Sequence, residues 1–349
     1  MIHVGLIGAG NISDTHAAAA AAIDGVRIAA VCGRTREKAA RLAARVGATP
    51  YDQLNRFLEH RPMDLVVIGS PSGLHAEQGI AAAKQGLHVL TEKPIDVTTL
   101  AADRLIAEAD RAGVTLGVIF QDRMKPDVQR LKALLDAGRL GTPILASASV
   151  RWHRPPEYYQ ASAWRGTRAL DGGGALMNQG VHSVDLLLWL FGPVLRVFGK
   201  AATRLHPIEV EDTVVAVLEF ASGAIGTLEA ATSAYPGYPR RIELTGSEGT
   251  VRLEGDRLVA IDLRQAVEEQ VATGANPVSV AASSPVVADT TAHRAVLEDF
   301  IAAIGRGGPP ACDGAQGRAS VAVIEAIYRS SSTGQPVELT QNPGNSVRP

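Results

Sequence analysis

The sequence predicts an α/β domain built on a doubly wound parallel sheet, followed by an α+β domain with an antiparallel sheet. In the first third, short runs rich in Val, Ile and Leu alternate with Ala-rich stretches of helical spacing. Such runs are typical of strands buried on both faces, and strand–helix–strand repetition gives a parallel sheet. In the second half, strand-like runs follow one another across short turns, which favours antiparallel pairing. The 349 residues suffice for two domains of about 150 residues each.

The apolar runs and their spacing give the expected elements of the first domain, which we assign to residues 1–122. Its strands are expected at Ile2–Ile7, Val26–Cys32, Leu65–Ile68, His88–Leu90 and Val114–Phe120. Its helices are expected at His16–Ile23, Glu37–Val46, His75–Lys84 and Leu100–Ala112.

The second domain is assigned to residues 123–349. Its strands are expected at Ile144–Arg151, Val194–Ala202, Thr213–Phe220, Ala224–Ala231, Arg241–Leu244 and Thr250–Leu253. Its helices are expected at Val128–Leu135, Asn178–Phe191, His293–Gly305 and Arg318–Ser331, and the polar, small-residue-rich segment Ala275–Thr291 is expected to be a loop.

Composition argues against several classes of protein. Lys and Arg number 34 and Asp and Glu number 36, so the net charge is −2 and no basic nucleic-acid surface is indicated. The two cysteines, Cys32 and Cys312, are far apart, which fits a reducing compartment and excludes a disulfide framework or a Cys-based zinc site. No apolar run reaches the ~18 residues of a membrane span, and the first residues lack a signal-peptide pattern. We therefore expect a soluble, cytoplasmic protein with no metal and no nucleic-acid or membrane partner.

A glycine turn between the first strand and the first helix indicates a phosphate-binding site. In the run Gly8-Ala9-Gly10-Asn11-Ile12-Ser13, Gly8 permits a tight turn, and Gly10 lets a pyrophosphate approach the helix N-terminus. Ser13 stands where a third glycine is usual, and it is small enough for close packing. The alternative is a glycine turn of a flavodoxin-like fold without a dinucleotide. The expected cofactor contacts at this turn are Gly8, Gly10, Asn11 and Ile12.

The end of the second strand bears on the choice of cofactor. An acid there would bind the ribose 2′-hydroxyl of NAD, but the first acid after the strand is Glu37. Arg34 presents a planar guanidinium suited to a 2′-phosphate, so NADP(H) is favoured over NAD(H). Gly33 and Arg34 join the expected cofactor contacts. The alternative is that Arg34 is a solvated residue that stacks on adenine.

A lysine follows the strand His88–Leu90 in the run Thr91-Glu92-Lys93-Pro94. Ligands of open α/β sheets bind outside the carboxyl ends of the strands, so Lys93 is placed where chemistry is expected. Pro94 restricts the backbone of the residue before it. The alternative is an ordinary surface lysine, which most lysines are.

A histidine follows the triple glycine Gly172–Gly174, near the start of a predicted helix. Asn178, His182 and Asp185 are spaced i, i+4 and i+7, which puts them on one helix face. A histidine is suited to proton transfer near neutral pH, so His182 is a candidate general base. Asp185 is a candidate to orient the imidazole or to bind substrate. The alternative is a hydrogen-bonded structural histidine.

Four segments together resemble the glucose–fructose oxidoreductase, inositol dehydrogenase and rhizopine-catabolism (Gfo/Idh/MocA) family over nearly the whole chain. They are Gly8-Ala9-Gly10, Ser70-Pro71-Ser72-Gly73-Leu74-His75, Gly86 through Pro94, and Gly172 through Asp185. The resemblance implies a Rossmann domain followed by a domain with a large, mostly antiparallel open sheet, through which members associate as homodimers or homotetramers. It also implies an NAD(P)-dependent oxidoreductase that oxidises a secondary alcohol of a sugar or cyclitol, or runs the reverse reduction.

The same resemblance implies residue roles. Lys93 would hydrogen-bond the reacting oxygen, His182 would exchange its proton, and Asp185 would contact the substrate or the lysine. The positions around the nicotinamide and its ribose are matched by Ser70, Pro71, Ser72, His75, Glu92 and Lys93.

One position departs from the family pattern. Many members carry Asp four residues before the histidine, where this chain has Asn178. In this respect the chain resembles enzymes acting on sugar nucleotides, such as nucleotide-linked hexosaminuronate 3-dehydrogenases. Aromatic faces and Arg donors suit a polyol or an acidic sugar. The further substrate candidates are Gln121, Arg123, Trp152, Tyr159, Trp164 and Arg165, and the alternative for the aromatic residues is hydrophobic packing.

Two rival functions share this scaffold. A non-catalytic sensor would bind a dinucleotide without turnover, and an imine or biliverdin-type reductase would use different chemistry. The presence of both Lys93 and His182 favours a dehydrogenase over either of them.

Overall fold

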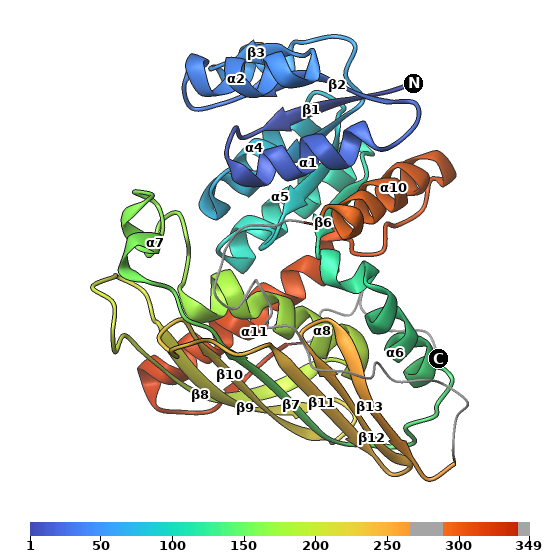
Figure 1. Ribbon diagram of the computed structural model, residues 1–349, viewed down its shortest axis with the longest axis vertical. Coiled ribbons are helices and arrows are strands. Elements are labelled where there is room, and N and C mark those ends of the chain that lie inside the picture. The colour runs from blue at the N-terminus through green and yellow to red at the C-terminus, as the bar shows by residue number, and fades with distance from the viewer. Residues whose placement is uncertain (266–288, 341–349) are drawn as a thin grey trace. The chain divides into compact units, whose positions relative to one another are not determined.

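The computed structural model describes residues 1–265 and 289–340 (Figure 1). The described residues form two compact units, 1–121 with 289–318, and 122–265 with 319–340. The sequence predicts one second domain from residue 123 onward, whereas residues 289–318 pack with the first unit. The reason is that α10 (Thr291–Arg306) lies against α1 (Asn11–Ala21), with the rings of His16 and His293 5.7 Å apart.

The first unit contains a six-stranded parallel sheet in the order β3-β2-β1-β4-β5-β6, which confirms the doubly wound prediction. Its strands are β1 (Ile2–Ile7), β2 (Val26–Cys32), β3 (Thr49–Tyr51), β4 (Leu65–Ile68), β5 (His88–Glu92) and β6 (Leu116–Ile119). Its other helices are α2 (Arg36–Val46), α3 (Leu54–Leu58), η1 (Ser72–Leu74), α4 (His75–Ala83) and α5 (Thr99–Ala112). The strand order reverses direction between β1 and β4, and ligands of such sheets bind at that point, beyond the carboxyl ends of the strands.

Local sequence explains where these helices begin and end. The hydroxyl of Thr35 accepts a hydrogen bond from the amide of Lys38 and caps α2, and Thr98 caps α5 in the same way. Both helices end at a glycine in the left-handed conformation, Gly47 and Gly113. Residues with a Cβ rarely adopt this conformation. Both ends of α2 and α5 are therefore fixed by local contacts, which also fixes where the loops before them end.

The second unit is built on an eight-stranded sheet in the order β13-β12-β11-β7-β10-β9-β8-β14. Every neighbouring pair is antiparallel except β7 and β10, which confirms the mostly antiparallel sheet. The strands are β7 (Pro143–Arg151), β8 (Val194–Ala202), β9 (Thr213–Phe220), β10 (Ile225–Ala231), β11 (Arg241–Gly246), β12 (Gly249–Glu254), β13 (Arg257–Leu263) and β14 (Val337–Glu338). The helices are η2 (Gln121–Met124), α6 (Pro126–Asp136), α7 (Pro156–Gln160), η3 (Ala175–Gly180), α8 (Val181–Phe191) and α11 (Gly314–Thr333).

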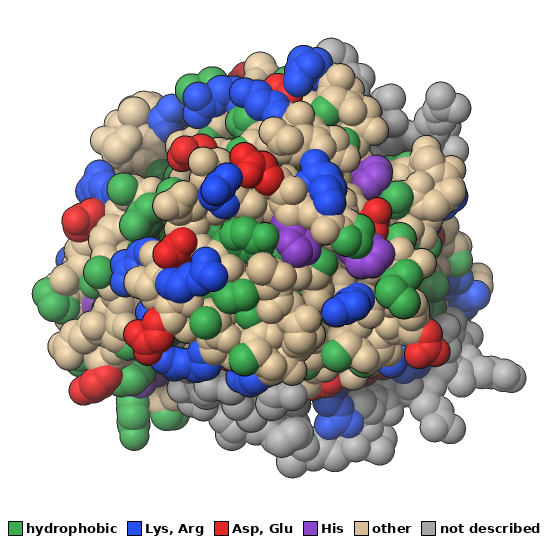
Figure 2. Space-filling view, turned by 90° about the horizontal axis from the view of Figure 1, so that it is seen from above, with side chains coloured by type: hydrophobic (Ala, Val, Ile, Leu, Met, Phe, Trp, Pro, Cys, Tyr) green, Lys and Arg blue, Asp and Glu red, His purple; other side chains and the backbone are tan. Residues whose placement is uncertain are grey.

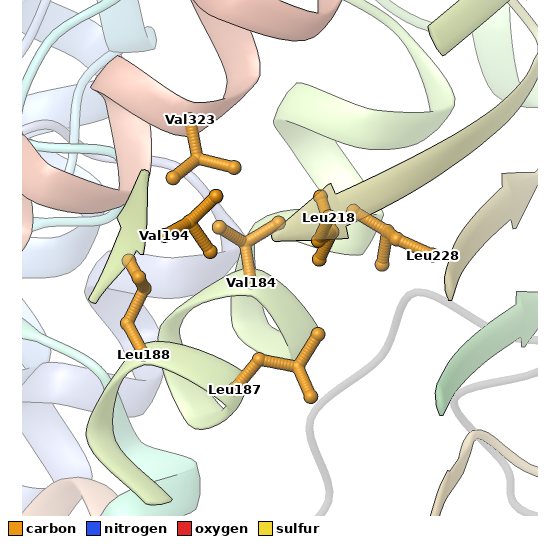
Figure 3. Close-up of a pocket in the computed structure, with 7 residues that line it drawn as sticks. All are labelled: Val184, Leu187, Leu188, Val194, Leu218, Leu228 and Val323. Carbon is orange, nitrogen blue, oxygen red and sulfur yellow. The ribbon is translucent and has the colours of Figure 1, made fainter. Parts of the chain in front are cut away.

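The two faces of this sheet differ. On one face, α8 and α11 pack over aliphatic side chains, and Figure 3 shows a small gap between them whose lining is entirely aliphatic. That lining identifies the gap as part of the core: Val184, Leu187, Leu188, Val194, Leu218, Leu228 and Val323. On the other face, large apolar side chains are exposed, among them Phe198, Val217 and Ile225. Strand alternation explains the contrast, because successive side chains point to opposite faces.

Two sequence expectations concern other parts of the chain. Ala275–Thr291, expected to be a loop, lies outside the described residues up to residue 288, and α10 begins at Thr291. Across residues 1–265 and 289–340, no helix combines the length and the apolar character needed to cross a membrane. On the face seen in Figure 2, Lys and Arg side chains are interspersed with Asp and Glu, as the net charge of −2 suggests.

Candidate active site

The glycine turn after β1 has two glycines with different structural reasons. Gly8 has φ +116°, and a Cβ there would lie 2.6 Å from the carbonyl oxygen of Gly69. At Gly10, the residue before α1, no described atom other than its own and those of its two chain neighbours lies within 4 Å of the position that a Cβ would take. The tight turn therefore requires Gly8, while Gly10 leaves the N-terminus of α1 open to a ligand. An open helix N-terminus with free amides is suited to an anion.

The carboxyl end of β2 carries an exposed arginine. Gly33 is closely packed, because a Cβ there would come within 3.1 Å of both Ala9 and Ala39. Arg34 is exposed and makes no hydrogen bond or ion pair with any described residue. The acid that follows, Glu37, is paired with Arg41 at 3.1 Å. Arg34 is therefore available for an anionic ligand at the edge where a dinucleotide's adenosine end is expected.

The loops that follow β4 and β5 are tied together by a buried histidine. Nδ1 of His75 lies 2.8 Å from the carbonyl oxygen of Pro94, and Nε2 lies 3.0 Å from that of Ser70. The Ser70 hydroxyl donates to Gln78 at 2.6 Å. His75 is only 1% exposed, so this expected cofactor residue acts by fixing the backbone on either side of the site. Lys93 precedes a cis proline in the same loop.

Glu92, expected near the nicotinamide, directs its carboxylate into the interior. Its Oε1 lies 3.0 Å from Nε2 of His16, and its Oε2 accepts a hydrogen bond from the amide of Lys93 at 3.2 Å. Burial alone would raise the pKa of Glu92, but the imidazole of His16, the second histidine His293 and the adjacent Lys93 hold that pKa at about 2. Glu92 therefore supports the backbone of Lys93 from behind.

In the second unit, His182 faces the buried carboxylate of Asp122, which lies in the run Gln121-Asp122-Arg123 that the sequence indicated as part of the pocket. Nδ1 of His182 lies 3.5 Å from Oδ2 of Asp122 in η2. Asp122 also pairs with Arg240 at 2.5 Å and with Lys125 at 3.0 Å. Burial would raise the pKa of Asp122, but the charges of Arg240, His182 and Lys125 hold it well below the usual range of a carboxyl. Asp122 is therefore a fixed negative charge beside His182.

Asp185, expected beside His182 or the substrate, is bound to another candidate, Arg123. Nε of Arg123 donates to Oδ2 at 2.8 Å and its Nη2 donates to Oδ1 at 2.6 Å. The guanidinium also lies 5.4 Å from the ring centroid of Trp189. Burial raises the pKa of Asp185 although Arg123 opposes the rise. The carboxylate facing Nδ1 of His182 is thus Asp122, and the Arg123–Asp185 pair joins η2 to α8.

Asn178 lies in a single π-helical turn, η3, which leads directly into α8. Its Nδ2 donates to Asp171 at 2.5 Å, and its Oδ1 accepts from Gln179 at 3.0 Å. Gln179 also donates to the hydroxyl of Tyr158 at 3.1 Å. The wider turn changes the helical spacing before His182, so the expected common face of Asn178, His182 and Asp185 is not that of one regular α-helix.

The triple glycine before η3 packs against a buried carboxylate. The amides of Gly174 and Leu176 each donate to Glu211 at 2.9 Å, and the hydroxyl of Tyr328 donates to it at 2.8 Å. A Cβ on Gly174 would lie 1.7 Å from the carbonyl oxygen of Glu211, and one on Gly173 would lie 2.2 Å from the Tyr328 hydroxyl. The glycines are therefore needed for the close approach that sets the start of η3.

Arginines and aromatic rings alternate in residues 152–165. Arg165 lies 4.3 Å from the ring centroid of Tyr158 and 5.5 Å from that of Trp164. Arg154 lies 5.0 Å from the ring centroid of Trp152 and is buried. We name these five residues the arginine–aromatic cluster. Trp164 and Arg165 are partly exposed, whereas Trp152 is buried and so fits the packing alternative better.

Tyr159, a further substrate candidate, is held by packing. Its hydroxyl lies 2.8 Å from that of Thr232, and its ring centroid lies 4.8 Å from that of His206. Burial raises the pKa of Tyr159 to about 12. Gln121, at the end of the first segment of the first unit, is partly buried.

Sequence reasoning missed the ion cluster around His182 and the histidines behind Glu92. The position of Asp122 after β6 indicated a place in the pocket, but nothing in the sequence indicated that it faces His182. Arg240 had no such signal, because it is 118 residues from Asp122. Within residues 1–265 and 289–340, no group of three or more His, Cys, Asp or Glu side chains is arranged to hold a metal ion.

Two family models match the chain. Residues 2–120 match "Oxidoreductase family, NAD-binding Rossmann fold", and residues 128–252 match "GFO/IDH/MocA C-terminal domain". Together they span the first sheet and most of the second.

Curated relatives and solved structures agree with these matches. D-apiose dehydrogenase of Paraburkholderia graminis is 30% identical over 96% of this chain and 88% of its own. D-xylose 1-dehydrogenase (NADP(+)) 2 of Haloferax volcanii is 30% identical over 89% of this chain and 91% of its own. The WlbA dehydrogenase of Bordetella pertussis, solved with NADH and UDP-GlcNAcA, is 34% identical, covers 98% of this chain and 99% of its own, and has a TM-score of 0.86.

Proposed function

Because the chain belongs to the GFO/IDH/MocA family of NAD-binding oxidoreductases, we propose that it transfers hydride between a nicotinamide dinucleotide and a secondary alcohol or ketone of a sugar, cyclitol or sugar derivative. The main support for the proposal comes from the carboxyl edge of the parallel sheet in the first unit. There the open N-terminus of α1 and the loop of Lys93 both lie beyond the carboxyl ends of parallel strands. A fold that bound a nucleotide for regulation alone would have no need of a lysine at that edge.

The residues present fit a dinucleotide. The open space at Gly10 leaves the first amides of α1 accessible to a pyrophosphate. A Cβ at this position would occupy that space. The loops carrying Ser70, Pro71 and Ser72 are fixed by His75, which keeps their backbone in place. Asn11, Ile12, Gly33 and Arg34 complete the proposed cofactor set.

The bound nicotinamide supplies the hydride acceptor or donor, and the protein supplies orientation and proton handling. Lys93 is assigned to the reacting oxygen, as a cation that hydrogen-bonds it and stabilises negative charge on it. His182 is assigned to the proton of that oxygen, which it accepts in oxidation and returns in reduction. Asn178, which is partly exposed, is assigned to a substrate hydroxyl.

The test is a panel of sugars, cyclitols and their keto forms with each dinucleotide, followed by nicotinamide absorbance. Turnover with at least one member supports the proposal. Dinucleotide binding without turnover of any member would favour a non-catalytic sensor.

We propose NADP(H) as the preferred cofactor. Support comes from Arg34, which is exposed, has no partner among the described residues, and is followed by an acid already paired with Arg41. Of the relatives, one carries NADP(+) in its name, whereas the WlbA structure holds NADH, so the preference depends on Arg34 rather than on family membership.

A second candidate function is oxidation of a sugar nucleotide, and the arginine–aromatic cluster favours it. A planar guanidinium binds a carboxylate or a phosphate with two hydrogen bonds, and a ring beside it can stack on a sugar or base. The WlbA dehydrogenase, solved with UDP-GlcNAcA, is 34% identical to this chain. A nucleotide-linked uronate therefore belongs in the panel beside the free sugar, and a much higher kcat/KM for the linked form would select this candidate.

We propose that the exposed face of the second sheet joins copies of the chain into a homodimer or homotetramer. Phe198 pairs across the strands with Val217, and Leu145 pairs with Ile225, and these four side chains are exposed on one face. Apolar patches of this kind mark interfaces. Sedimentation equilibrium tests the proposal, and a monomer at micromolar concentration would contradict it.

The two buried free thiols, Cys32 and Cys312, support a cytoplasmic location.

A further inference from the structure

His182 is faced by one carboxylate within a larger cluster of charges. Asp122 lies 3.5 Å from its Nδ1, and Arg240 and Lys125 both pair with that carboxylate. Beyond these, Asp256 pairs with both cations, while Asp185 and Arg123 pair with one another. Asp122 is therefore the charged group that bears on His182 most directly.

We propose that Asp122 is a positioning residue for His182, which keeps the proton of the neutral imidazole on Nδ1 and leaves Nε2 as the proton acceptor. The inference rests on the proposed role of His182. A carboxylate accepts but does not donate, so its charge at 3.5 Å favours the tautomer with the hydrogen on the facing nitrogen, Nδ1. The other nitrogen, Nε2, then carries the lone pair that a general base requires.

Asp122 is built to remain an anion. Its Oδ1 lies 3.0 Å from Nζ of Lys125, and its Oδ2 lies 2.5 Å from Nη1 of Arg240. Arg240 is fixed in turn by Asp256 at 2.8 Å and by the carbonyl oxygen of Gly255 at 3.3 Å. These contacts keep Asp122 ionised and hold its carboxylate in place. The carboxylate therefore faces the same nitrogen of His182, Nδ1, in every catalytic cycle.

A merely structural role is the alternative. The same ion cluster joins η2 to the turn between β12 and β13, and removing Asp122 would loosen that junction whether or not His182 is affected. The two roles differ in what they change. Loss of a structural tie lowers stability, whereas loss of the positioning charge also changes the protonation of His182.

The test compares Asp122→Asn with Asp127→Asn in the full-length protein. Asp127 is a matched carboxylate in α6, which accepts from the amide of Leu258 at 2.9 Å and pairs with Arg130. Both variants lose a carboxylate with a cationic partner in the same region, but only Asp122 faces His182. We expect kcat/KM to fall about 10- to 100-fold in Asp122→Asn, with little change in dinucleotide affinity.

The pH profile supplies a reading that a structural role would not move. A carboxylate favours the charged imidazolium, so its removal is expected to lower the pKa of His182. The cations Arg240, Lys125 and Arg123 remain in the cluster and act in the same direction. The acidic limb of kcat/KM for oxidation is therefore expected at lower pH in Asp122→Asn and unshifted in Asp127→Asn. An unshifted limb in both variants, or the same shift in both, would overturn the proposal.

A second measurement does not depend on the reaction. In protein labelled with 15N-histidine, the resonances of His182 are assigned by their loss in His182→Gln. The wild-type ring is expected to carry its neutral-form hydrogen on Nδ1, and Asp122→Ala is expected to shift the population toward Nε2. A wild-type ring protonated on Nε2 would overturn the proposal even if the enzyme is active. Absence of turnover in the wild type would instead contradict the proposed function and leave this measurement to decide the role of Asp122.

Discussion

Arg123 and Asp185 are joined by two hydrogen bonds of 2.8 and 2.6 Å, with side chains that are 3% and 1% exposed. The pair connects η2, which carries Asp122, to α8, which carries His182. Two residues expected to contact the substrate thus bind one another and join the two segments that carry Asp122 and His182.

This pairing predicts that the stability losses of the two single replacements do not add in the double replacement. Asp185→Leu leaves the charge of Arg123 buried without its partner, so the free energy of unfolding is expected to fall by about 3–5 kcal/mol. Arg123→Met is expected to cost about as much, and the double variant less than the sum. Urea denaturation measures all three. Costs that simply add would show that the two side chains are not coupled.

The two glycines of the first turn predict two different phenotypes. Gly8→Ala meets the carbonyl oxygen of Gly69 at positive φ, so it is expected to lower the melting temperature and to weaken dinucleotide binding. Gly10→Ala meets open space, so the fold is expected to keep its melting temperature while the dinucleotide Kd rises at least about tenfold. Thermal denaturation and dinucleotide fluorescence distinguish them. Unchanged affinity in Gly10→Ala would argue against a pyrophosphate at this turn.

Glu92 predicts a pH-dependent contribution to stability. Its pKa is about 2 in the folded protein, against an ordinary value of 4.5, so folding favours the ionised form. The contribution is fully present above about pH 5 and is lost as the pH falls from 4.5 toward 2. Glu92→Gln is therefore expected to be less stable than the wild type at pH 7, and the difference is expected to shrink at pH 4. Urea denaturation at the two pH values measures this, and the exposed Glu37→Gln is the control. A constant difference would contradict the ion pair with His16.

Much of the fold could be predicted from local pattern. The strands Val194–Ala202 and Thr213–Phe220 were predicted with the bounds that the structure has, because the turn residues Gly192-Pro193 precede the first and Ala221-Ser222-Gly223 follow the second. β3 was missed because it has three residues and contains a proline. The return of α10 to the first unit has no local signal, since it depends on packing between residues far apart in the chain.

The site was predictable where it follows strand ends, and less so elsewhere. Lys93 and the glycine turn lie at the carboxyl edge, as their positions after strands indicated. The roles of Asp122 and Asp185 could not be separated, because the choice between them depends on where Arg123 and Arg240 reach. Such long-range ion pairs leave no periodicity in the sequence.

Arg34 predicts the cofactor preference. Arg34→Ser is expected to raise the Kd of NADPH about 10- to 100-fold, because a charged hydrogen bond contributes about 1.5–3 kcal/mol, and to leave the Kd of NADH within about twofold. Arg41→Ser removes a cation of the same helix region that is paired with Glu37, and it is expected to change neither. Fluorescence titration with both dinucleotides measures the ratio. Tighter binding of NADH than of NADPH by the wild type would refute the preference.

The role proposed for Lys93 in hydride transfer is tested most directly by the turnover and dinucleotide affinity of Lys93→Ala, measured with a substrate found in the panel. Lys84→Ala, an exposed lysine at the end of α4, is the control. Lys93→Ala is expected to lose turnover by about 10²- to 10⁴-fold while its dinucleotide Kd stays within about twofold of the wild type. Turnover at the wild-type rate in Lys93→Ala would contradict it.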